Sequence, residues 1–410
     1  MSDPFDGARI LIYSHDSFGL GHLRRCRAIA HALVEHHKGL SVLILSGSPI
    51  IGSFDFRARV DFVRIPGVIK LHNGEYTSLG LHIDLEQTLA MRESIIRHTA
   101  EIFAPDIFLV DKEPLGLKGE VHGTLQLLKR QGTRLVLGLR DVMDSPAQLR
   151  REWRRKQAMG ALAELYDEIW VYGLEAINDP LAGLTVPAGV RDKMLYTGYL
   201  RRTLPHAKAV HPAVNLDEPY LLVTPGGGGD GAEMVDWVIR AYAADPELPW
   251  RALIVFGPFM APALRHEFRS RIAQLPRLTA LDFDTDMEQL MARATGIVAM
   301  GGYNTFCEIL SFDKRALLIP RTRPRQEQYL RASRAQKLGL VRMLDPAAPR
   351  NAALMARALR ALPAQPLPSE AGIPGLLDGL DTVSRLVAEH LGRRRPHAQT
   401  TPSGRLRTLA

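Results

Sequence analysis

Short apolar runs alternate with amphipathic segments along most of this chain. Runs rich in β-branched residues indicate buried strands, and apolar residues at helical spacing indicate helices between them. In the first half the pattern predicts strands at residues 8–13, 41–45, 61–65, 106–110, 134–139 and 168–172, and a long helix at 85–102. Strands that alternate with helices are typical of a parallel sheet covered by helices on both faces.

The same order begins again after a proline-containing stretch. A strand at 220–224 runs into a glycine loop and a helix at 232–242, and further strands are predicted at 251–256, 278–282, 296–300 and 315–319. We therefore predict an α/β protein with two Rossmann-like domains facing each other across a cleft. The predicted parts are an N-terminal domain (1–204), a linker (205–219), a C-terminal domain (220–370), a C-terminal helix (371–392) and a disordered basic tail (393–410).

Glycines follow the first strand of each half. In the first half, Gly19 and Gly21 precede His22. In the second half, Gly226–Gly229 form a run of four glycines. Ligands bind at this carboxyl edge of a parallel sheet, and a glycine loop that opens a helix suits a diphosphate. The run is not a Walker A loop, because no Gly-Lys-Ser/Thr follows it, and it lacks the pattern of a dinucleotide-binding oxidoreductase.

A second loop in the C-terminal half opens another helix. Gly301 and Gly302 end the strand at 296–300, Thr305 lies near the predicted helix cap, and Glu308 lies in the opening turns. A carboxylate at that place accepts two hydrogen bonds from a vicinal diol such as ribose, or it offsets the helix dipole.

Four elements of the second half resemble the donor domain of GT-B glycosyltransferases. They are the glycine run at 226–229, Phe-Asp-Thr-Asp-Met at 283–287, Gly-Gly-x-x-Thr-x-x-Glu ending at Glu308, and Arg-Gln-Glu-Gln-Tyr at 325–329. The similarity is greatest to the MurG-type enzymes that use UDP-N-acetylglucosamine. It implies a GT-B fold in which the second half binds a UDP-sugar.

The resemblance also assigns donor-binding roles. It implies that Phe283 lies near the uracil and Glu308 at the ribose, and that Glu327 and Gln328 contact the donor sugar. The family usually has a hydroxyl residue among the first glycines; its absence here leaves the diphosphate to backbone N–H groups and Thr224. The full set of expected donor-binding residues is Gly21, Thr224, Gly226, Gly227, Gly228, Phe283, Gly301, Gly302, Asn304, Thr305, Glu308, Glu327 and Gln328.

The N-terminal loop supplies the candidate catalytic residues. MurG-type enzymes carry a glycine loop and a histidine at the place of His22, and a histidine suits the task of general base at neutral pH. Asp111 ends a strand at the same sheet edge, with Glu113 two residues later, and either carboxylate could orient the imidazole. Arg140 and Asp141 end the next strand and either face the cleft or pair with each other. Alternatively, His22 only caps the helix.

Two other functions fit the same residues. The string Gly-Leu-Gly-His-Leu-Arg-Arg-Cys at 19–26 is similar to a segment of the UDP-sugar hydrolase of the pseudaminic acid pathway, in which water replaces the acceptor. Hydrolysis or epimerisation of a UDP-sugar therefore stays open, as does a non-catalytic protein that binds nucleotide sugars.

Composition and charge limit the expected location of the protein and the classes of partner that it binds. The 410 residues are 46% hydrophobic with a net charge of +8, and neither a membrane-spanning run nor a signal-peptide pattern is present. We expect a cytoplasmic protein, with peripheral contact at the inner face of a membrane as an option. Basic clusters at 150–156 and 321–325 suit small anions or anionic lipids, and the absence of any recognition motif argues against nucleic acid.

Neither a metal nor a cofactor is expected. Asp284 and Asp286 resemble a metal-binding Asp-x-Asp motif, but a helix predicted from residue 287 makes Asp286 a better helix cap. Cys26 and Cys307 cannot form a disulfide framework or a zinc site alone, and we expect both to be buried. The expected partners are a nucleotide-sugar donor, as co-substrate, and an unidentified lipid-linked, polysaccharide or small-molecule acceptor.

Overall fold

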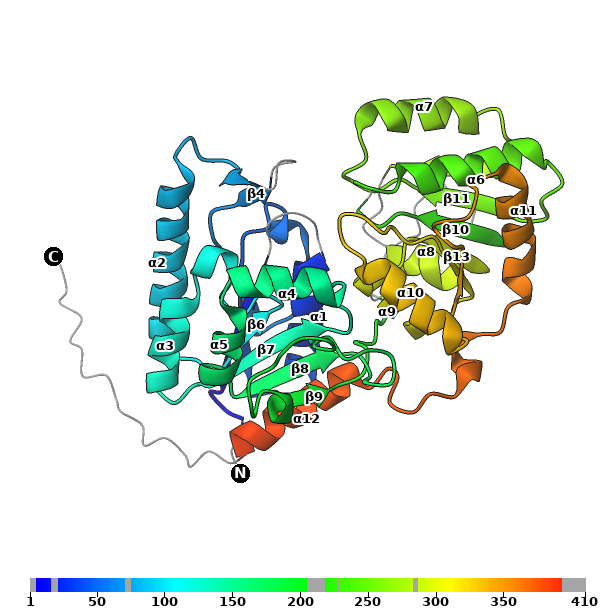
Figure 1. The fold of residues 1–410 in the computed structure, drawn as a ribbon. Coiled ribbons are helices and arrows are strands. Elements are labelled where there is room, and N and C mark those ends of the chain that lie inside the picture. Colours follow the sequence, from blue (N-terminus) through cyan, green and yellow to red (C-terminus); the bar gives the residue numbers. More distant parts are fainter. Residues whose placement is uncertain are drawn as a thin grey trace.

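Figure 1 shows the protein as two lobes side by side, each built around its own sheet. This computed structural model describes residues 5–15, 21–70, 75–204, 218–227, 229–282 and 287–392. Several predicted features lie outside the described residues: Gly19, Gly228, Phe283, Asp284, Asp286, most of the linker, and the tail from residue 393.

The sheet of the first lobe has seven parallel strands in the order β3-β2-β1-β6-β7-β8-β9. These strands are β1 (Arg9–Ser14), β2 (Ser41–Ser46), β3 (Val60–Arg64), β6 (Ile107–Asp111), β7 (Arg134–Arg140), β8 (Glu168–Tyr172) and β9 (Met194–Tyr196). The helices of this lobe are α1 (Gly21–His36), α2 (Leu85–Phe103), α3 (His122–Arg130), α4 (Pro146–Arg155) and α5 (Ala158–Glu164). A small antiparallel pair, β4 (Val68–Lys70) and β5 (Tyr76–Ser78), stands apart from the sheet.

The second lobe repeats this design with six parallel strands in the order β12-β11-β10-β13-β14-β15. The strands are β10 (Tyr220–Thr224), β11 (Arg251–Val255), β12 (Leu278–Leu281), β13 (Gly296–Ala299), β14 (Ala316–Leu318) and β15 (Arg342–Met343). The helices are α6 (Ala232–Ala244), α7 (Pro262–Ile272), α8 (Met287–Arg293), α9 (Tyr303–Ser311), α10 (Glu327–Lys337) and α11 (Ala352–Ala361). Every strand expected from the apolar runs is present and ends within one residue of its prediction.

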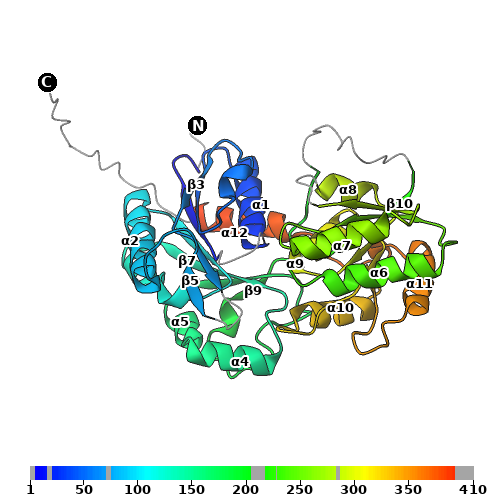
Figure 2. The same ribbon diagram turned by 90° about the horizontal axis from the view of Figure 1, so that it is seen from above.

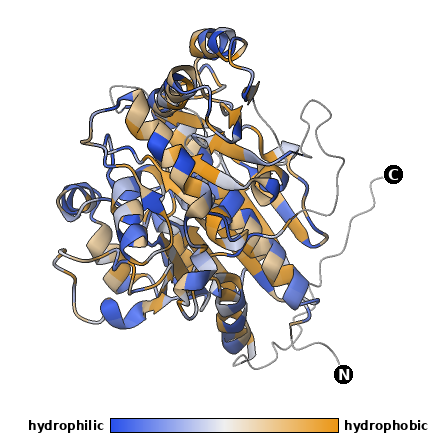
Figure 3. Ribbon diagram, turned by 90° about the vertical axis from the view of Figure 1, so that its right-hand side faces the viewer, coloured by the Kyte–Doolittle hydropathy of each residue, from blue (hydrophilic) through white to orange (hydrophobic). Residues whose placement is uncertain are grey.

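Helices cover both faces of each sheet, as the apolar strands require. In the first lobe, α2, α3, α4 and α5 pack on one face and α1 on the other. In the second, α6, α7 and α11 cover one face and α8, α9 and α10 the other. Figure 3 shows the strands as a mostly hydrophobic layer between helices of mixed character. Cys26 and Cys307 are buried in α1 and α9, as expected.

The last helix joins the two lobes. The segment predicted as a C-terminal helix over 371–392 is helical from Gly379, forming α12 (Gly379–Gly392), which lies against α1 of the first lobe (Figures 1 and 2). His37 contacts the Ser384 hydroxyl oxygen at 2.8 Å through Nε2. Tyr199 packs edge-on against Phe306 of α9 with ring centroids 5.1 Å apart, so one apolar core runs through both lobes.

In both sheets the strand order reverses at the first strand of the lobe. β1 lies between β2 and β6, and β10 lies between β11 and β13. Neighbouring connections therefore leave to opposite sides at these two points, where open α/β sheets bind ligands. His22 lies in α1, which follows β1, and Asp111 ends β6, while the two glycine loops of the second lobe follow β10 and β13.

Candidate active site

A cleft of about 380 Å³ lies between the two lobes at these strand ends. Twelve of the residues predicted for the site line it: Gly21, His22, Thr224, Gly226, Gly227, Gly301, Gly302, Asn304, Thr305, Glu308, Glu327 and Gln328. Asp111 lies directly behind His22, and Gly228 and Phe283 lie outside the described residues. The fold therefore brings together every predicted site residue that the structure describes.

His22 occupies the first turn of α1 and is held by a buried carboxylate. Its Nδ1 lies 2.5 Å from Oδ2 of Asp111, the last residue of β6. Arg25, one turn further along α1, donates from Nε to Oδ1 at 2.8 Å and from Nη2 to Oδ2 at 2.6 Å. With the Nδ1 proton directed at Asp111, the His22 Nε2 keeps a lone pair free to accept a proton. Glu113, the other carboxylate considered, pairs with Lys156 at 2.7 Å instead.

Burial determines the charge of this group. It lowers the pKa of His22 to about 4, although Asp111 acts in the opposite direction. Burial alone would raise the pKa of Asp111, but Arg25 and His22 hold that pKa well below its usual range. Above about pH 5, His22 is thus a neutral imidazole next to a charged carboxylate. His15, whose ring centroid is 5.6 Å from that of His22, is also kept neutral, because burial lowers its pKa to about 3.

The start of α9 faces the cleft with unused backbone donors. Gly302 is the N-cap, and no side chain caps the helix, so Thr305 lies near the cap without making a capping hydrogen bond. The first N–H groups of a helix have no partner within it, and the helix dipole makes that end attractive to anions. Gly301 has a φ of +81°, a conformation that glycine adopts without strain and that brings the backbone to the cleft.

The first glycine loop follows β10, the strand that pairs with β13. Thr224 at the end of β10 uses its hydroxyl to accept a hydrogen bond from Gly226 N at 3.2 Å, so it shapes the loop as well as lining the cleft. Gly257 keeps the loop close, since a Cβ there would lie 2.4 Å from the Gly226 carbonyl oxygen. Two backbone segments, Gly226–Gly227 and Gly301–Gly302, thus follow neighbouring strands and form walls of the cleft that suit a phosphate group.

Glu308 is buried and contacts the other lobe. Arg24 of α1 donates from Nη2 to Glu308 Oε1 and, at 2.6 Å, to Glu288 Oε1. Burial raises the pKa of Glu308, with Arg24 acting against that rise. Glu308 lines the cleft, and its second carboxylate oxygen accepts no hydrogen bond from the described residues.

The start of α10 supplies a second carboxylate. Burial would raise the pKa of Glu327, but Arg321 and Arg140 together keep it lowered. Arg321 donates to Glu327 Oε1 at 2.7 Å, whereas Glu327 Oε2 is buried without a partner among the described residues. Gln328 accepts a hydrogen bond from Arg321 N at 3.1 Å through Oε1, which leaves its amide N–H groups for a ligand.

Arg140 and Asp141 do not pair with each other. Asp141 is fully buried and accepts two hydrogen bonds from Arg331 of α10, at 2.8 and 2.6 Å, so it links the lobes. Arg140 lines the cleft, in agreement with the first of the two interpretations. The basic clusters are likewise partly neutralised, because Arg325 pairs with Glu152 and Lys156 pairs with Glu113.

Sequence reasoning missed the arginines that hold the carboxylates. Arg24, Arg25 and Arg331 each bind an acid far away in the chain, and the last two also lie over the ring of Tyr303, at 5.5 and 5.6 Å from its centroid. One signal in the sequence was the position of Arg25, about one helical turn after His22 in a predicted helix.

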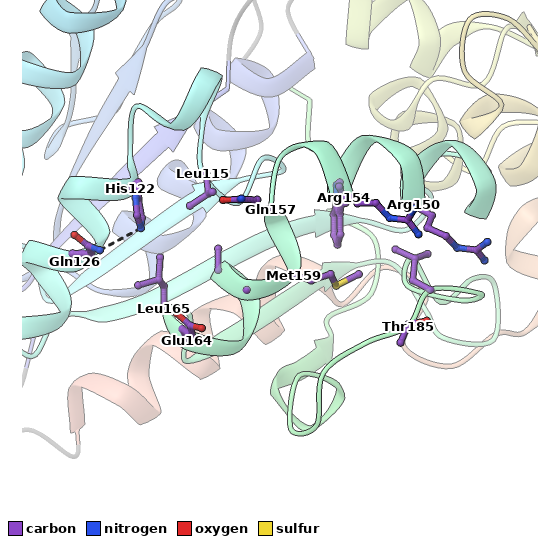
Figure 4. A pocket seen from close by; sticks show the side chains of 14 residues that line it. Leu115, His122, Gln126, Arg150, Arg154, Gln157, Met159, Glu164, Leu165 and Thr185 are labelled. Atoms are coloured by element: carbon purple, nitrogen blue, oxygen red, sulfur yellow. Dashed lines mark hydrogen bonds between the residues drawn. The ribbon is translucent and has the colours of Figure 1, made fainter.

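A second cavity of about 690 Å³ lies on the first lobe among α3, α4 and α5. Figure 4 shows Arg150 and Arg154 toward one end, with Met159 near Arg154, and His122, Gln126 and Leu165 toward the other. None of these residues lines the cleft between the lobes. In the described ranges, no helix has the length and hydropathy to cross a bilayer, and no three His, Cys, Asp or Glu side chains are grouped as metal ligands.

One protein-family model matches part of the second lobe. Residues 228–363 match the glycosyltransferase family 28 C-terminal domain, in line with the enzyme class expected from the motifs. A search of curated protein sequences finds no significant match.

Several solved structures that resemble nearly the whole chain are glycosyltransferases. The calicheamicin glycosyltransferase CalG4 is 16% identical with a TM-score of 0.60, covering 95% of this chain and 100% of its own. UGT2 of Phytolacca americana, complexed with UDP-2-fluoro-glucose and pterostilbene, is 15% identical with a TM-score of 0.64, covering 93% and 99%. MurG of Acinetobacter baumannii is 13% identical with a TM-score of 0.57, covering 93% and 99%. These similarities confirm the GT-B arrangement of two Rossmann-like domains, and they do not single out the MurG type.

Proposed function

We propose that this protein is a metal-independent glycosyltransferase that moves a sugar from a UDP-sugar to a hydroxyl group of an acceptor. The observation that carries the proposal is the position of His22, whose Nδ1 is held by Asp111 while its side chain lines the same cleft as the two glycine walls. A base and a diphosphate cradle on opposite lobes are the two parts that transfer from a nucleotide sugar requires.

The bond changes assign a task to each part. The acceptor oxygen attacks the anomeric carbon, its proton passes to His22 Nε2, and the bond from that carbon to the diphosphate oxygen breaks, releasing UDP. Asp111 and Arg25 keep the imidazole oriented, and the negative charge of Asp111 stabilises the imidazolium that forms. The N-terminus of α9 and the glycine loop stabilise charge on the departing diphosphate.

The nucleotide is proposed to bind the second lobe through Glu308. Its carboxylate is buried at the cleft and has an oxygen left over for ribose hydroxyls, while Arg24 occupies the other oxygen. Met287 and Met291 of α8 line the cleft near the expected position of the uracil, and both side chains are apolar. UDP-N-acetylglucosamine is the donor suggested by the motifs.

A UDP-sugar hydrolase is the second candidate. The segment shared with that family includes Arg25 and Cys26, and here Arg25 orients the base through Asp111 while Cys26 packs in the core. Orientation of His22 serves attack by water as well as attack by a sugar hydroxyl, so this observation supports both reactions.

A donor panel in EDTA, with and without lipid and polysaccharide extracts as acceptors, tests the proposal. We expect release of UDP that requires an acceptor, and a Glu308→Ala variant that binds UDP more weakly by about 1.5–3 kcal/mol, as for a lost hydrogen bond to a charged group. Free sugar formed at full rate without acceptor would identify a hydrolase. Loss of UDP binding in EDTA would contradict the metal-independent mechanism.

A further inference from the structure

Four arginines line the cleft, and three of them are neutralised. Arg24 pairs with Glu308 and Glu288, Arg25 pairs with Asp111, and Arg321 pairs with Glu327 and Asp230. Arg140 is the fourth, and within the described part of the chain no carboxylate lies within ion-pair distance of it.

Arg140 also lacks hydrogen bonds that would explain its position. Its Nε is buried and has no partner among the described residues, and its side chain is only partly exposed. Burial lowers the pKa of Arg140 to about 10, with Glu327 acting in the opposite direction from beyond contact distance. A guanidinium held out of water without a counter-charge is costly, and an anionic ligand in the cleft would compensate for that cost.

Arg140 lines the same cleft as the two glycine segments that form the phosphate walls. Arg25 and Arg331 both influence its pKa, and Arg331 donates to the Gly301 carbonyl oxygen at 3.0 Å while Arg25 lies over the Tyr303 ring. Arg140, the last residue of β7, therefore lines from the first lobe the same cleft as the start of α9. Glu327, proposed to contact the donor sugar, lines the cleft as well, and Arg140 helps to lower its pKa.

We infer that Arg140 binds the β-phosphate of the nucleotide from the acceptor lobe and stabilises the charge that UDP gains as it leaves. This inference rests on the proposed function and extends it, because it assigns leaving-group stabilisation to a residue outside the donor domain. The outer phosphate adjoins the bond that breaks, so a cation there acts on developing charge, while the helix terminus supplies only partial charges.

The test compares the affinities of UDP, UMP and uridine for the wild-type protein and for Arg140→Met by calorimetry. A guanidinium on the β-phosphate predicts that Arg140→Met weakens UDP roughly 10- to 100-fold, as for a lost charge-assisted hydrogen bond, and leaves UMP and uridine nearly unchanged. Arg140→Lys should retain part of the preference for UDP. The matched control is Arg151→Met on the exposed surface of α4, for which all three affinities should equal those of the wild type.

Other outcomes overturn the inference in distinct ways. UDP and UMP affinities that both equal those of the wild type would show that Arg140 contacts neither phosphate. An equal loss for UMP and UDP would place the residue on the inner phosphate instead. A loss for uridine as well would indicate a structural role, and near-ultraviolet circular dichroism checks the fold of each variant. A wild-type protein that binds none of the three ligands refutes the proposed function itself.

Discussion

Burial affects the proton affinity of His22, the base that we propose, more than its partner Asp111 does. Burial lowers its pKa to about 4, and Asp111 limits that fall. The dependence of kcat/KM on pH reports ionisations of the free enzyme, so the acid limb should have its midpoint near pH 4 and not near the ordinary histidine value of about 6.5. In the wild type, activity should therefore be flat from about pH 5.5 to 7.5.

The Asp111→Asn variant checks the direction of this effect. Without the carboxylate, Arg25 and Lys112 still lower the pKa of His22, so the acid limb should move to lower pH while kcat falls. Rates measured between pH 3.5 and 8, with circular dichroism at each pH to exclude unfolding, decide the matter. A wild-type midpoint at or above 6.5 would show that a different group carries the proton.

At the scale of elements, two chain segments cross where β9 leads into the connection between the lobes. Gly198 has a φ of +88°, and a Cβ on it would lie 2.4 Å from the Gly375 carbonyl oxygen. Gly189 has a similar φ of +77° but open space around the same position. Both substitutions to alanine force a side chain into the left-handed region, at a cost of about 1–2 kcal/mol.

Gly198→Ala should therefore destabilise the protein by about 1–3 kcal/mol more than Gly189→Ala, because only the first also creates a clash with backbone. Thermal melts of the two variants side by side measure the difference. Equal melting temperatures would mean that the crossing adapts without cost, and that α12 is docked less tightly than its contacts indicate.

The elements themselves were largely predictable from sequence, and the pairs between them were not. Apolar runs located the strands because buried parallel strands need them. Glycine loops at strand ends located the walls of the cleft. In contrast, Arg24 with Glu308 and Arg331 with Asp141 join residues separated by 284 and 190 positions, and no local pattern relates such partners. The short edge strands β9 and β15, of three and two residues, also lack a usable pattern.

For the whole molecule, the pair between Arg331 and Asp141 fixes one lobe against the other. Both side chains are completely buried, so removing one partner leaves a charge in the interior. Arg331→Met should lower the free energy of unfolding by about 3–5 kcal/mol, and the double variant with Asp141→Asn should recover much of this loss.

An exposed pair provides the comparison. Arg385 and Glu389 stand four residues apart on α12 with side chains 60% and 46% exposed, and Arg385→Met should cost less than about 1 kcal/mol. Urea unfolding of the three variants measures these values. A cost for Arg331→Met as small as that for Arg385→Met would show that the lobes are not held together through Asp141.

Both lobes take part in the reaction that we propose, and one variant separates their contributions. His22→Ala removes the base from the first lobe and leaves the walls of the nucleotide site on the second lobe intact. The most direct measurement is UDP release from the donor that the wild type turns over, in EDTA and with its acceptor, alongside the UDP affinity of the same samples. We predict a rate lower by about 10²–10⁴-fold with UDP affinity almost unchanged. Wild-type turnover in His22→Ala would contradict the mechanism and leave the opening of α1 with a structural role.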